Sequence, residues 1–256
     1  MKSIYFISDA HLGCRAMKHG RTRERRLVRF LDAIKEKAEA VYMLGDMFDF
    51  WFEYTDVVPK GFTRFLGKVS ELTDSGIEVH YFLGNHDMWC GDYLEKECGV
   101  IIHREPCTLE LHGREFYLDH GHHADLGSGD RWSAFMFRCF ESRSLRRLAR
   151  MIHPHWFMTF GNNWATHSRQ KHERVGEDGF KGEDRENIIT FAKTYLTQHP
   201  TINYFIFGHR HIELDCKLSH DTHLIILGEW YNRCTYAEFD GEYLYLSNYV
   251  EGDTQL

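Results

Sequence analysis

The chain has 256 residues, of which 43% are hydrophobic and 27% are charged. This composition is typical of a globular protein that buries a large core, and it excludes a disordered chain, a collagen and a disulfide-rich scaffold. The formal net charge of −7 argues against a protein that binds nucleic acid over its whole surface. The 18 histidines exceed an even share among twenty residue types, and because histidine is the commonest metal ligand they favour a metal site.

The cysteines and the apolar segments indicate a reducing compartment and no membrane span. Only four consecutive apolar residues, 4–7, precede the first acidic residue, whereas the core of a signal peptide needs roughly 7–15. No stretch approaches the roughly 20 apolar residues of a membrane-spanning helix. The seven cysteines are an odd number without a Cys-x-x-Cys pair, which favours reduced thiols over a disulfide framework or a cysteine zinc site. We expect a cytoplasmic protein, with attachment to a membrane surface left open.

Short apolar runs alternate with amphipathic stretches in the first half of the chain. Buried strands are expected at residues 3–8, 40–44 and 78–83, which are rich in Val, Ile, Tyr and Phe. Between them, residues 24–37 and 62–72 carry apolar side chains at helical spacing. This β-α-β-α-β order predicts a parallel sheet with right-handed crossovers.

The remainder of the main domain predicts a second sheet. Residues 108–111 and 115–118 flank His112-Gly113 and are typical of a hairpin. Further strands are expected at residues 203–207, 224–227, 235–239 and 243–247, with Asp240-Gly241 as a tight turn. The expected architecture is α/β, with two packed sheets and helices outside, in a main domain formed by residues 1–123 and 183–256.

Residues 124–182 do not follow this rhythm, and we interpret them as a mostly helical insertion on the main domain. Aromatic residues alternate there with arginines that include Arg143, Arg146, Arg147 and Arg150. A second basic run lies at residues 15–29. Each run is either a solvated helix face or an interfacial surface attracted to anionic lipid, which would let the insertion dock the protein on a membrane. Nucleic-acid binding by residues 15–29 is disfavoured by the acidic net charge.

Polar side chains follow five of the expected strands at the point where each strand ends. They are Asp9 and His11, Asp46 and Asp49, Asn85 and His86, His120, and His209 and His211. Because ligands bind outside the carboxyl ends of strands in open α/β sheets, these side chains are expected to converge. Glycine beside four of the five groups lets the backbone turn sharply toward a shared point.

The residue types in these groups suit hard or borderline divalent metals. Carboxylate, amide and imidazole ligands without thiolates favour Mn, Fe, Zn or Mg over copper(I) or iron–sulfur clusters. Seven ligands exceed the four of one tetrahedral zinc site, whereas two ions that share a carboxylate account for the number. Two ions about 3.5–4 Å apart can hold a bridging hydroxide and neutralise the attacking and leaving oxygens of a phosphoryl displacement.

Taken in chain order, the motifs Asp-x-His, Gly-Asp-x-x-Asp, Gly-Asn-His-Asp, His-Gly and Gly-His-x-His resemble those of the calcineurin-like metallophosphoesterases. The resemblance implies a four-layer α-β-β-α sandwich and two divalent ions, with manganese expected. It assigns Asp9, His11 and His211 to one ion, Asn85, His120 and His209 to the other, and Asp46 to both. It also makes His86 the catalytic histidine, Asp49 the acid that orients it, and Asn85, His86 and His209 the substrate-binding residues.

Three shorter segments narrow the expected substrate. Residues 8–13, 45–51 and 227–230 are similar to the UDP-2,3-diacylglucosamine diphosphatase family of lipid A synthesis. The similarity implies hydrolysis of a lipid-linked nucleotide sugar to UMP and a lipid sugar 1-phosphate at the inner membrane surface, with the insertion as a cap over the acyl chains. The best-known members of that family carry Gly-Asn-Arg-Asp where residues 84–87 are Gly-Asn-His-Asp. A metal-dependent phosphodiesterase or dinucleotide phosphatase of the same fold therefore stays open as the alternative.

Two other readings are disfavoured by the same residues. A non-catalytic scaffold does not need all seven ligand positions filled, as they are here. A protein phosphatase needs an open groove, which an aromatic insertion would crowd. His122 and His123, which follow the His-Gly motif, are expected to serve local structure. Asp87 and Asp119 are expected either to support the ligands without binding metal or to serve structure.

Overall fold

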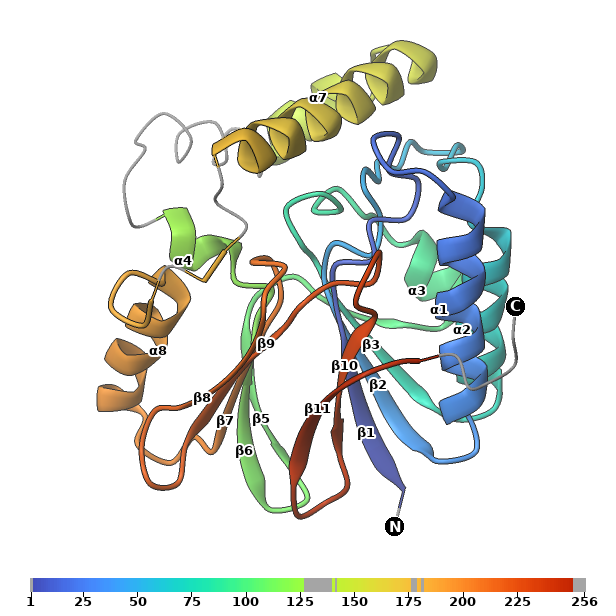
Figure 1. Ribbon diagram of the computed structural model, residues 1–256. Coiled ribbons are helices and arrows are strands. Elements are labelled where there is room, and N and C mark those ends of the chain that lie inside the picture. The colour runs from blue at the N-terminus through green and yellow to red at the C-terminus, as the bar shows by residue number, and fades with distance from the viewer. Residues whose placement is uncertain (1, 127–139, 141, 176–178, 181, 251–256) are drawn as a thin grey trace.

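The structure is a computed structural model that describes residues 2–126, 140, 142–175, 179–180 and 182–250. One sheet contains, in spatial order, β11 (Leu244–Asn248), β10 (Thr235–Phe239), β1 (Ser3–Ile7), β2 (Ala38–Leu44), β3 (Glu78–Phe82) and β4 (Ile101–His103). The other contains β5 (Cys107–Leu111), β6 (Arg114–Leu118), β7 (Tyr204–Phe207), β9 (His223–Leu227) and β8 (Glu213–Lys217). The two sheets pack against each other, as Figure 1 shows.

Helices cover the outer faces of both sheets. Helices α1 (Gly20–Ile34) and α2 (Thr63–Asp74) lie on the first sheet, and α8 (Asn187–Gln198) lies on the second (Figure 1). The short helices α3 (Tyr93–Cys98) and α4 (His122–Leu126) follow β3 and β6. The layers are therefore α-β-β-α, which confirms the fold class expected from the motifs.

Strand β1 shows why an inner strand is apolar on both faces. Ile4 and Phe6 point into the core between the sheets, where Phe116 packs against Phe6 with ring centroids 5.8 Å apart. Tyr5 and Ile7 point the other way, into the core beneath α1. Successive side chains of a strand point to opposite faces, so a strand covered on both sides needs a continuous apolar run.

The strand directions bring the motif-bearing strand ends to one rim of the sandwich. Strands β1, β2 and β3 are parallel in the first sheet, and β6 and β7 are parallel in the second. Figure 1 shows that the loops after these strands gather at the same end of both sheets. The expected β-α-β-α-β unit and the hairpin of β5 with β6 are thus confirmed.

Some elements are not predicted by the sequence patterns. Strand β8 alternates Glu213, Asp215 and Lys217 at the edge of the second sheet, where it pairs only with β9 among the described strands. Strand β4 has three residues, too few to show an alternation of apolar and polar side chains. Helix α1 begins at Gly20, four residues before its expected start at residue 24. Edge strands need only one buried face and short elements carry little pattern, so both escape periodicity.

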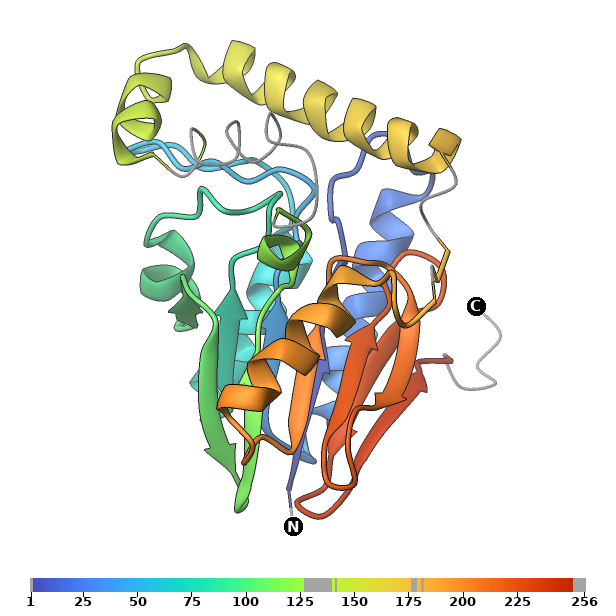
Figure 2. The ribbon, with the colours of Figure 1, turned by 90° about the vertical axis from the view of Figure 1, so that its left-hand side faces the viewer.

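In the described part of the insertion, two helices lie beyond the rim. Helices α6 (Arg143–Ala149) and α7 (Pro154–Val175) sit above the strand ends, and Figure 2 shows α7 crossing this end of the molecule. Residues 127–139 of the expected insertion lie outside the described residues, and its division from the main domain stays a prediction. Among the described residues, no helix has the length and apolar character to cross a membrane, and none of six cysteines forms a disulfide.

Two histidines on the neighbouring strands β3 and β4 form a pair whose pKa values are changed by folding. His80 Nδ1 and His103 Nε2 lie 2.9 Å apart, so one ring donates a hydrogen bond to the other. His80 stacks on Tyr42 with ring centroids 4.2 Å apart, and His103 stacks on Phe82 at 4.4 Å. Burial lowers the pKa of both histidines below their ordinary value. Folding therefore favours the neutral rings.

We expect this pair to make the free energy of unfolding fall as the pH falls. The pKa of each histidine is lowered in the folded state, so the unfolded chain binds more protons below about pH 6.5 and stability present above that pH is lost. His80→Phe keeps an aromatic ring on Tyr42 and removes one titration. Urea unfolding of the variant should show a shallower loss between about pH 7.5 and 5.5 than the wild type. Equal slopes would contradict this role of the pair.

Candidate metal centre

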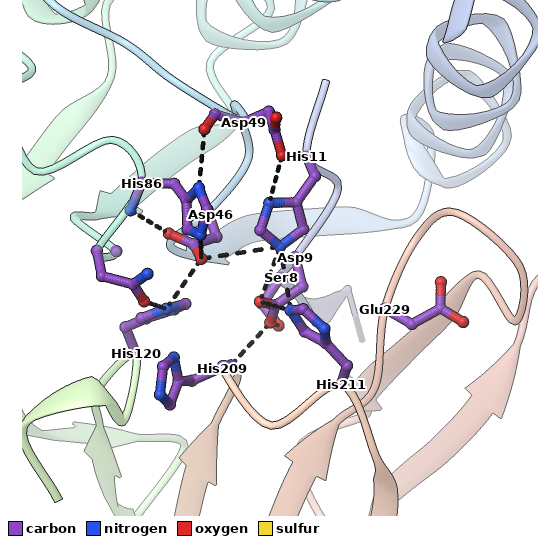
Figure 3. Close-up of polar contacts among 12 residues, drawn as sticks. Ser8, Asp9, His11, Asp46, Asp49, His86, His120, His209, His211 and Glu229 are labelled. Atoms are coloured by element: carbon purple, nitrogen blue, oxygen red, sulfur yellow. Dashed lines mark hydrogen bonds and ion pairs between the residues drawn. The ribbon is translucent and has the colours of Figure 1, made fainter. Parts of the chain in front are cut away.

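The structure brings the motif residues from five strand ends into one cluster. Figure 3 shows Asp9, His11, Asp46, His86, His120 and His211 pointing toward a common point, with Asp49 and His209 beside them. In the part of the chain that the structure describes, three sets of side chains place their ligand atoms within 4.8 Å of one another. They are Asp9 with His11 and His211, His11 with Asp46 and His86, and Asp9 with Asp46 and His120. Convergence, which the sequence predicted from strand ends alone, is therefore seen in the geometry.

The first ligand group contains Asp9, His11 and His211. The Nε2 atoms of His11 and His211 lie 3.1 Å apart, and Asp9 Oδ1 lies 3.1 Å from His211 Nε2 and 3.5 Å from His11 Nε2. Ligand atoms bound at about 2.1 Å to one ion are roughly 3–3.5 Å apart, so this spacing fits a single divalent cation. Burial disfavours the charged carboxylate, but His211 and a hydrogen bond from His11 hold the pKa of Asp9 well below its usual range.

The second ligand group contains Asn85 and His120 beside Asp46. His120 Nε2 lies 3.1 Å from Asn85 Oδ1 and 3.4 Å from Asp46 Oδ2. His120 Nδ1 donates to the Leu44 carbonyl over 2.7 Å, which leaves Nε2 as the ligand nitrogen. Against the effect of burial, the charge of Asp46 raises the pKa of His120 to about 10. The carboxylates of the cluster therefore stabilise a positive charge at His120. A metal cation bound there would compete with the proton on this ring.

Asp46 lies between the two groups. Its Oδ2 is 3.7 Å from His11 Nε2 on one side and 3.4 Å from His120 Nε2 on the other. Its Oδ1 accepts the main-chain N–H of His86 over 2.8 Å, which fixes the carboxylate plane. Burial opposes its charge, yet His120 and His86 keep the pKa of Asp46 well below its usual range. This is the position that a carboxylate shared by two ions requires.

His209 has its ring beside the second group, but among the described residues it belongs to none of the three ligand sets. Its ring centroid lies 5.2 Å from that of His120, and its main-chain N–H donates to Asp9 Oδ2 over 2.9 Å. His122 and His123 have ring centroids 3.9 Å apart, and neither belongs to a ligand set among the described residues. Burial lowers the pKa of His122 well below its ordinary value, so it is a neutral ring at the edge of the site.

Five of the seven candidate ligands have left-handed backbone conformations. The φ angles are +54° at Asp9, +42° at His11, +53° at Asp46, +67° at His209 and +52° at His211. Positive φ is uncommon outside glycine, and strained backbone of this kind gathers at functional sites, where the surrounding fold holds it. The clustering of strain at these positions is an independent mark of function that no sequence period reveals.

Two glycines of the motifs are required by close approach rather than by flexibility. A Cβ at Gly84 would overlap Asp46, and a Cβ at Gly208 would lie 2.6 Å from both Asp9 Oδ2 and Ser8 Oγ. Only a residue without a side chain lets these loops lie against the carboxylates. The glycines therefore set how closely the loops after β3 and β7 approach the candidate ligands.

The expected pairing of Asp49 with His86 differs from the one observed. His86 Nδ1 contacts the main-chain carbonyl of Asp49 over 2.8 Å, whereas Asp49 Oδ1 lies 3.4 Å from His11 Nδ1. The acid thus orients a candidate metal ligand, and the carbonyl orients His86. A carboxylate behind the second nitrogen of a ligand histidine is a common arrangement at metal sites, because it fixes the tautomer and the ring.

The segment after β9 supports the first ligand group in a way that sequence reasoning missed. The Tyr231 hydroxyl lies 3.3 Å from His211 Nδ1. Glu229 accepts the main-chain N–H groups of Tyr231, Asn232 and Arg233 over 2.6–2.9 Å, and Trp230 N–H donates to the Asp9 carbonyl over 3.1 Å. The similarity of residues 227–230 to known sequences pointed to this segment but gave it no role.

Two further contacts also depend on residues distant in sequence. Arg210, between two candidate ligands, donates from Nε and Nη2 to the buried carboxylate of Glu186 over 3.0 and 3.2 Å. Helix α7 of the insertion brings Trp164 over His86, with ring centroids 6.1 Å apart. No local signal singles out Glu186, since it lies 24 residues from its partner.

The chain matches the sequence profile of the calcineurin-like phosphoesterases over residues 2–213. It belongs to this family. A UDP-2,3-diacylglucosamine hydrolase of Porphyromonas gingivalis is 43% identical over 255 residues, which cover 96% of this chain and 97% of that protein. A protein of the same name from Neisseria gonorrhoeae is 30% identical over 237 residues and 91% of each chain. The calcineurin-like phosphoesterase described here is therefore a hydrolase of a family that uses divalent metal ions.

Proposed function

We propose that this phosphoesterase cleaves the diphosphate of UDP-2,3-diacylglucosamine, or of a closely related lipid-linked nucleotide sugar, to UMP and a lipid sugar 1-phosphate. The observation that carries the proposal is the position of the ligand cluster beneath an insertion that lines an apolar cavity. The names of the relatives support the same substrate class.

The candidate ligands would hold two cations, for which manganese is the expected metal. Asp9, His11 and His211 would hold one, Asn85, His120 and His209 the other, and Asp46 both. When bound, such a pair supplies a hydroxide nucleophile and neutralises the charge that develops on the phosphoryl oxygens. Oxygen and imidazole donors without a thiolate fit this role.

His86 would act on the phosphoryl group from the insertion side. The Asp49 carbonyl can only accept, so His86 Nδ1 carries the hydrogen of their 2.8 Å contact. Nε2 faces the cluster, 4.0 Å from Asp46 Oδ2. In the imidazolium form it can donate to a non-bridging oxygen or pass a proton to the leaving oxygen. Asn85, beside it, would bind the same phosphoryl group through its amide.

The acyl chains would occupy the apolar cavity, whose volume is about 650 Å³. Phe50, Phe52, Val57 and Val58 line it from the loop after β2, and Met158 lines it from α7. The cap is held on this loop, because Phe157 packs on Phe52 with ring centroids 4.6 Å apart and Arg150 Nε donates to the Glu53 carbonyl over 3.2 Å. Such a volume is within the range of ligand pockets.

Release of UMP tests the proposed function. The purified protein is incubated with UDP-2,3-diacylglucosamine and Mn²⁺, and with EDTA in place of the metal as the control. We expect UMP in the first reaction only. No UMP above the EDTA control would overturn the proposal.

A phosphodiesterase or dinucleotide phosphatase is the alternative, because His86 matches the histidine of metallophosphoesterases in general. A panel of bis-nucleotides and simple phosphate esters, assayed under the same Mn²⁺ conditions, separates the two functions. A lipid enzyme should prefer its own substrate strongly, since the apolar cavity contributes binding only to ligands with acyl chains. Equal rates on a bis-nucleotide would favour the alternative.

We propose further that the insertion attaches the protein to an anionic membrane from the cytoplasmic side. Four large apolar residues of the insertion are exposed to solvent, with exposed fractions of 60% for Leu148, 82% for Met151, 69% for Trp156 and 56% for Phe160. Arg147, beside them, is exposed as well. Exposed apolar side chains beside arginines fit the headgroup region of anionic lipid. Figure 2 shows the two helices at the end of the molecule opposite the N-terminus.

Vesicle flotation is expected to depend on these side chains. The double variant Met151→Glu/Trp156→Glu should lower the vesicle-bound fraction by about tenfold, because two large apolar groups lose their insertion. Tyr243→Glu, at an exposed aromatic residue of the turn between β10 and β11 in the main domain, is the control. Wild-type binding should weaken at high salt. If the double variant floats as the control does, the membrane proposal fails.

A further inference from the structure

A second large cavity opens beside the first ligand group, at the start of α1. Its volume is about 610 Å³. We call it the basic pocket, and its lining consists of Met17, Lys18, His19, Thr22, Arg23, Arg26, Tyr231 and Asn232. Three of these side chains carry a full positive charge, and no carboxylate is among them. The pocket is therefore suited to an anionic, polar ligand.

The basic pocket adjoins the candidate metal centre through one side chain. Tyr231 lines the pocket, and its hydroxyl lies 3.3 Å from His211 Nδ1 in the first ligand group. Glu229 holds the loop of Tyr231 by accepting three main-chain N–H groups. Tyr231 is therefore a fixed part of the pocket wall and also contacts a residue of the metal centre.

A smaller cavity of about 330 Å³ joins the basic pocket to the apolar cavity beneath the insertion. It shares Met17 with the basic pocket, and it shares Leu12, Gly13, Arg15 and Phe62 with the apolar cavity. Neighbouring cavities share lining residues, so the three lie in a row along the loop after His11, and we call this row the groove. One end of this groove is apolar and the other is basic.

This polarity matches a ligand that carries acyl chains at one end and a nucleotide at the other. We propose that the basic pocket binds the nucleoside end of the substrate, with the acyl chains in the apolar cavity and the diphosphate at the metal centre. Lys18 and Arg26 would face the ribose and attract the negative charge of the adjoining diphosphate, while Thr22 and Asn232 offer hydrogen-bonding groups to a polar base. The inference rests on the proposed function, because it takes the substrate to be a nucleotide sugar.

Binding of UMP to the Mn²⁺-loaded protein, measured by calorimetry, tests the pocket. Lys18→Glu reverses a charge at an exposed lining position, and Thr22→Trp fills the pocket from an exposed position on α1. Arg25→Glu is the matched control, since it makes the same charge change at an exposed residue of α1 outside this lining. We expect both lining variants to weaken UMP binding by at least about tenfold, and the control by less than about twofold.

Steady-state kinetics on UDP-2,3-diacylglucosamine give a second readout. The loss in the lining variants should fall mainly on KM, because the pocket holds the substrate and not the reacting atoms. Thermal unfolding of each variant shows whether it is folded.

The outcomes separate the inference from the proposed function. UMP affinities of both lining variants equal to that of Arg25→Glu overturn the inference even if the wild type releases UMP. Weaker vesicle flotation of the lining variants with unchanged UMP affinity assigns the pocket to lipid headgroups and also overturns it. A wild type that binds UMP in the pocket but releases none from the lipid substrate overturns the proposed function alone.

Discussion

Replacing Asp46 by alanine is expected to abolish metal-dependent hydrolysis while the chain still folds. Asp46 Oδ2 lies 3.4–4.0 Å from the Nε2 atoms of His120, His11 and His86, so its carboxylate is within reach of both ligand groups. Its loss removes the negative charge that would hold two cations together. We expect kcat/KM to fall by at least about 10³-fold, which corresponds to about 4 kcal/mol of transition-state stabilisation. His120→Ala should have a comparable effect through the second group.

Metal content and turnover are measured on the same preparation of this variant. Bound manganese should fall below two ions per chain, and UMP release from UDP-2,3-diacylglucosamine should fall with it. Asp221→Ala is the control, because this aspartate is exposed and lies in the turn between β8 and β9. Circular dichroism should show folded protein for both variants. Near-native turnover with two bound ions in Asp46→Ala would contradict the shared-ligand assignment.

Replacing Asp87 by asparagine is expected to destabilise the chain by about 3 kcal/mol. Asp87 is fully buried, and Oδ1 accepts the Gly84 N–H over 2.7 Å. Oδ2 accepts the Met47 N–H over 2.9 Å and the Tyr81 hydroxyl over 2.6 Å. An amide has one acceptor oxygen, so its NH₂ group would face a buried donor and leave it unpaired, at a cost of about 1–3 kcal/mol for each lost acceptor.

The same substitution should lower activity, because Asp87 ties the loop after β2 to the loop after β3. These loops carry Asp46 and Asn85, whose relative position sets the shared metal site. Urea unfolding gives the stability, and Tyr81→Phe is the matched control because it removes one donor and leaves the carboxylate, with an expected loss of about 1 kcal/mol. If Asp87→Asn is as stable as Tyr81→Phe, the carboxylate does not connect the loops as described.

The strand ends were predictable because the information that places them is local. A buried strand is a short apolar run, and Gly45-Asp46 or Gly84-Asn85 directly after such a run marks where it stops. Parallel strands present their carboxyl ends at one edge, so five such stops predict one cluster. The sequence also predicted that Asp87 and Asp119 support the structure around the site, and the contacts of Asp87 agree with this prediction.

The pairings inside the cluster were not predictable, because they join residues that only packing brings together. Asp49 was expected to orient His86 through its carboxylate. The carboxylate instead lies beside His11, and the main-chain carbonyl of Asp49 accepts the hydrogen bond from His86. Which of the two groups faces which histidine depends on the left-handed turns at His11 and Asp46, and no residue period encodes a φ angle. Tyr231 and Glu186 were missed because their partners lie 20 and 24 residues away.

From its amino-acid pattern alone, this chain specifies two packed sheets, the identity of the polar residues at their strand ends and the class of metal those residues suit. Local periodicity and side-chain chemistry carry that information, since neither depends on what lies opposite. Tertiary structure decides the rest: the 3.1 Å spacing of His11 and His211, the placing of Trp164 over His86, and the groove that runs from an apolar to a basic end. Each of these arises between segments that are distant in sequence. Their relative positions are fixed only when the layers of helices and sheets pack against each other.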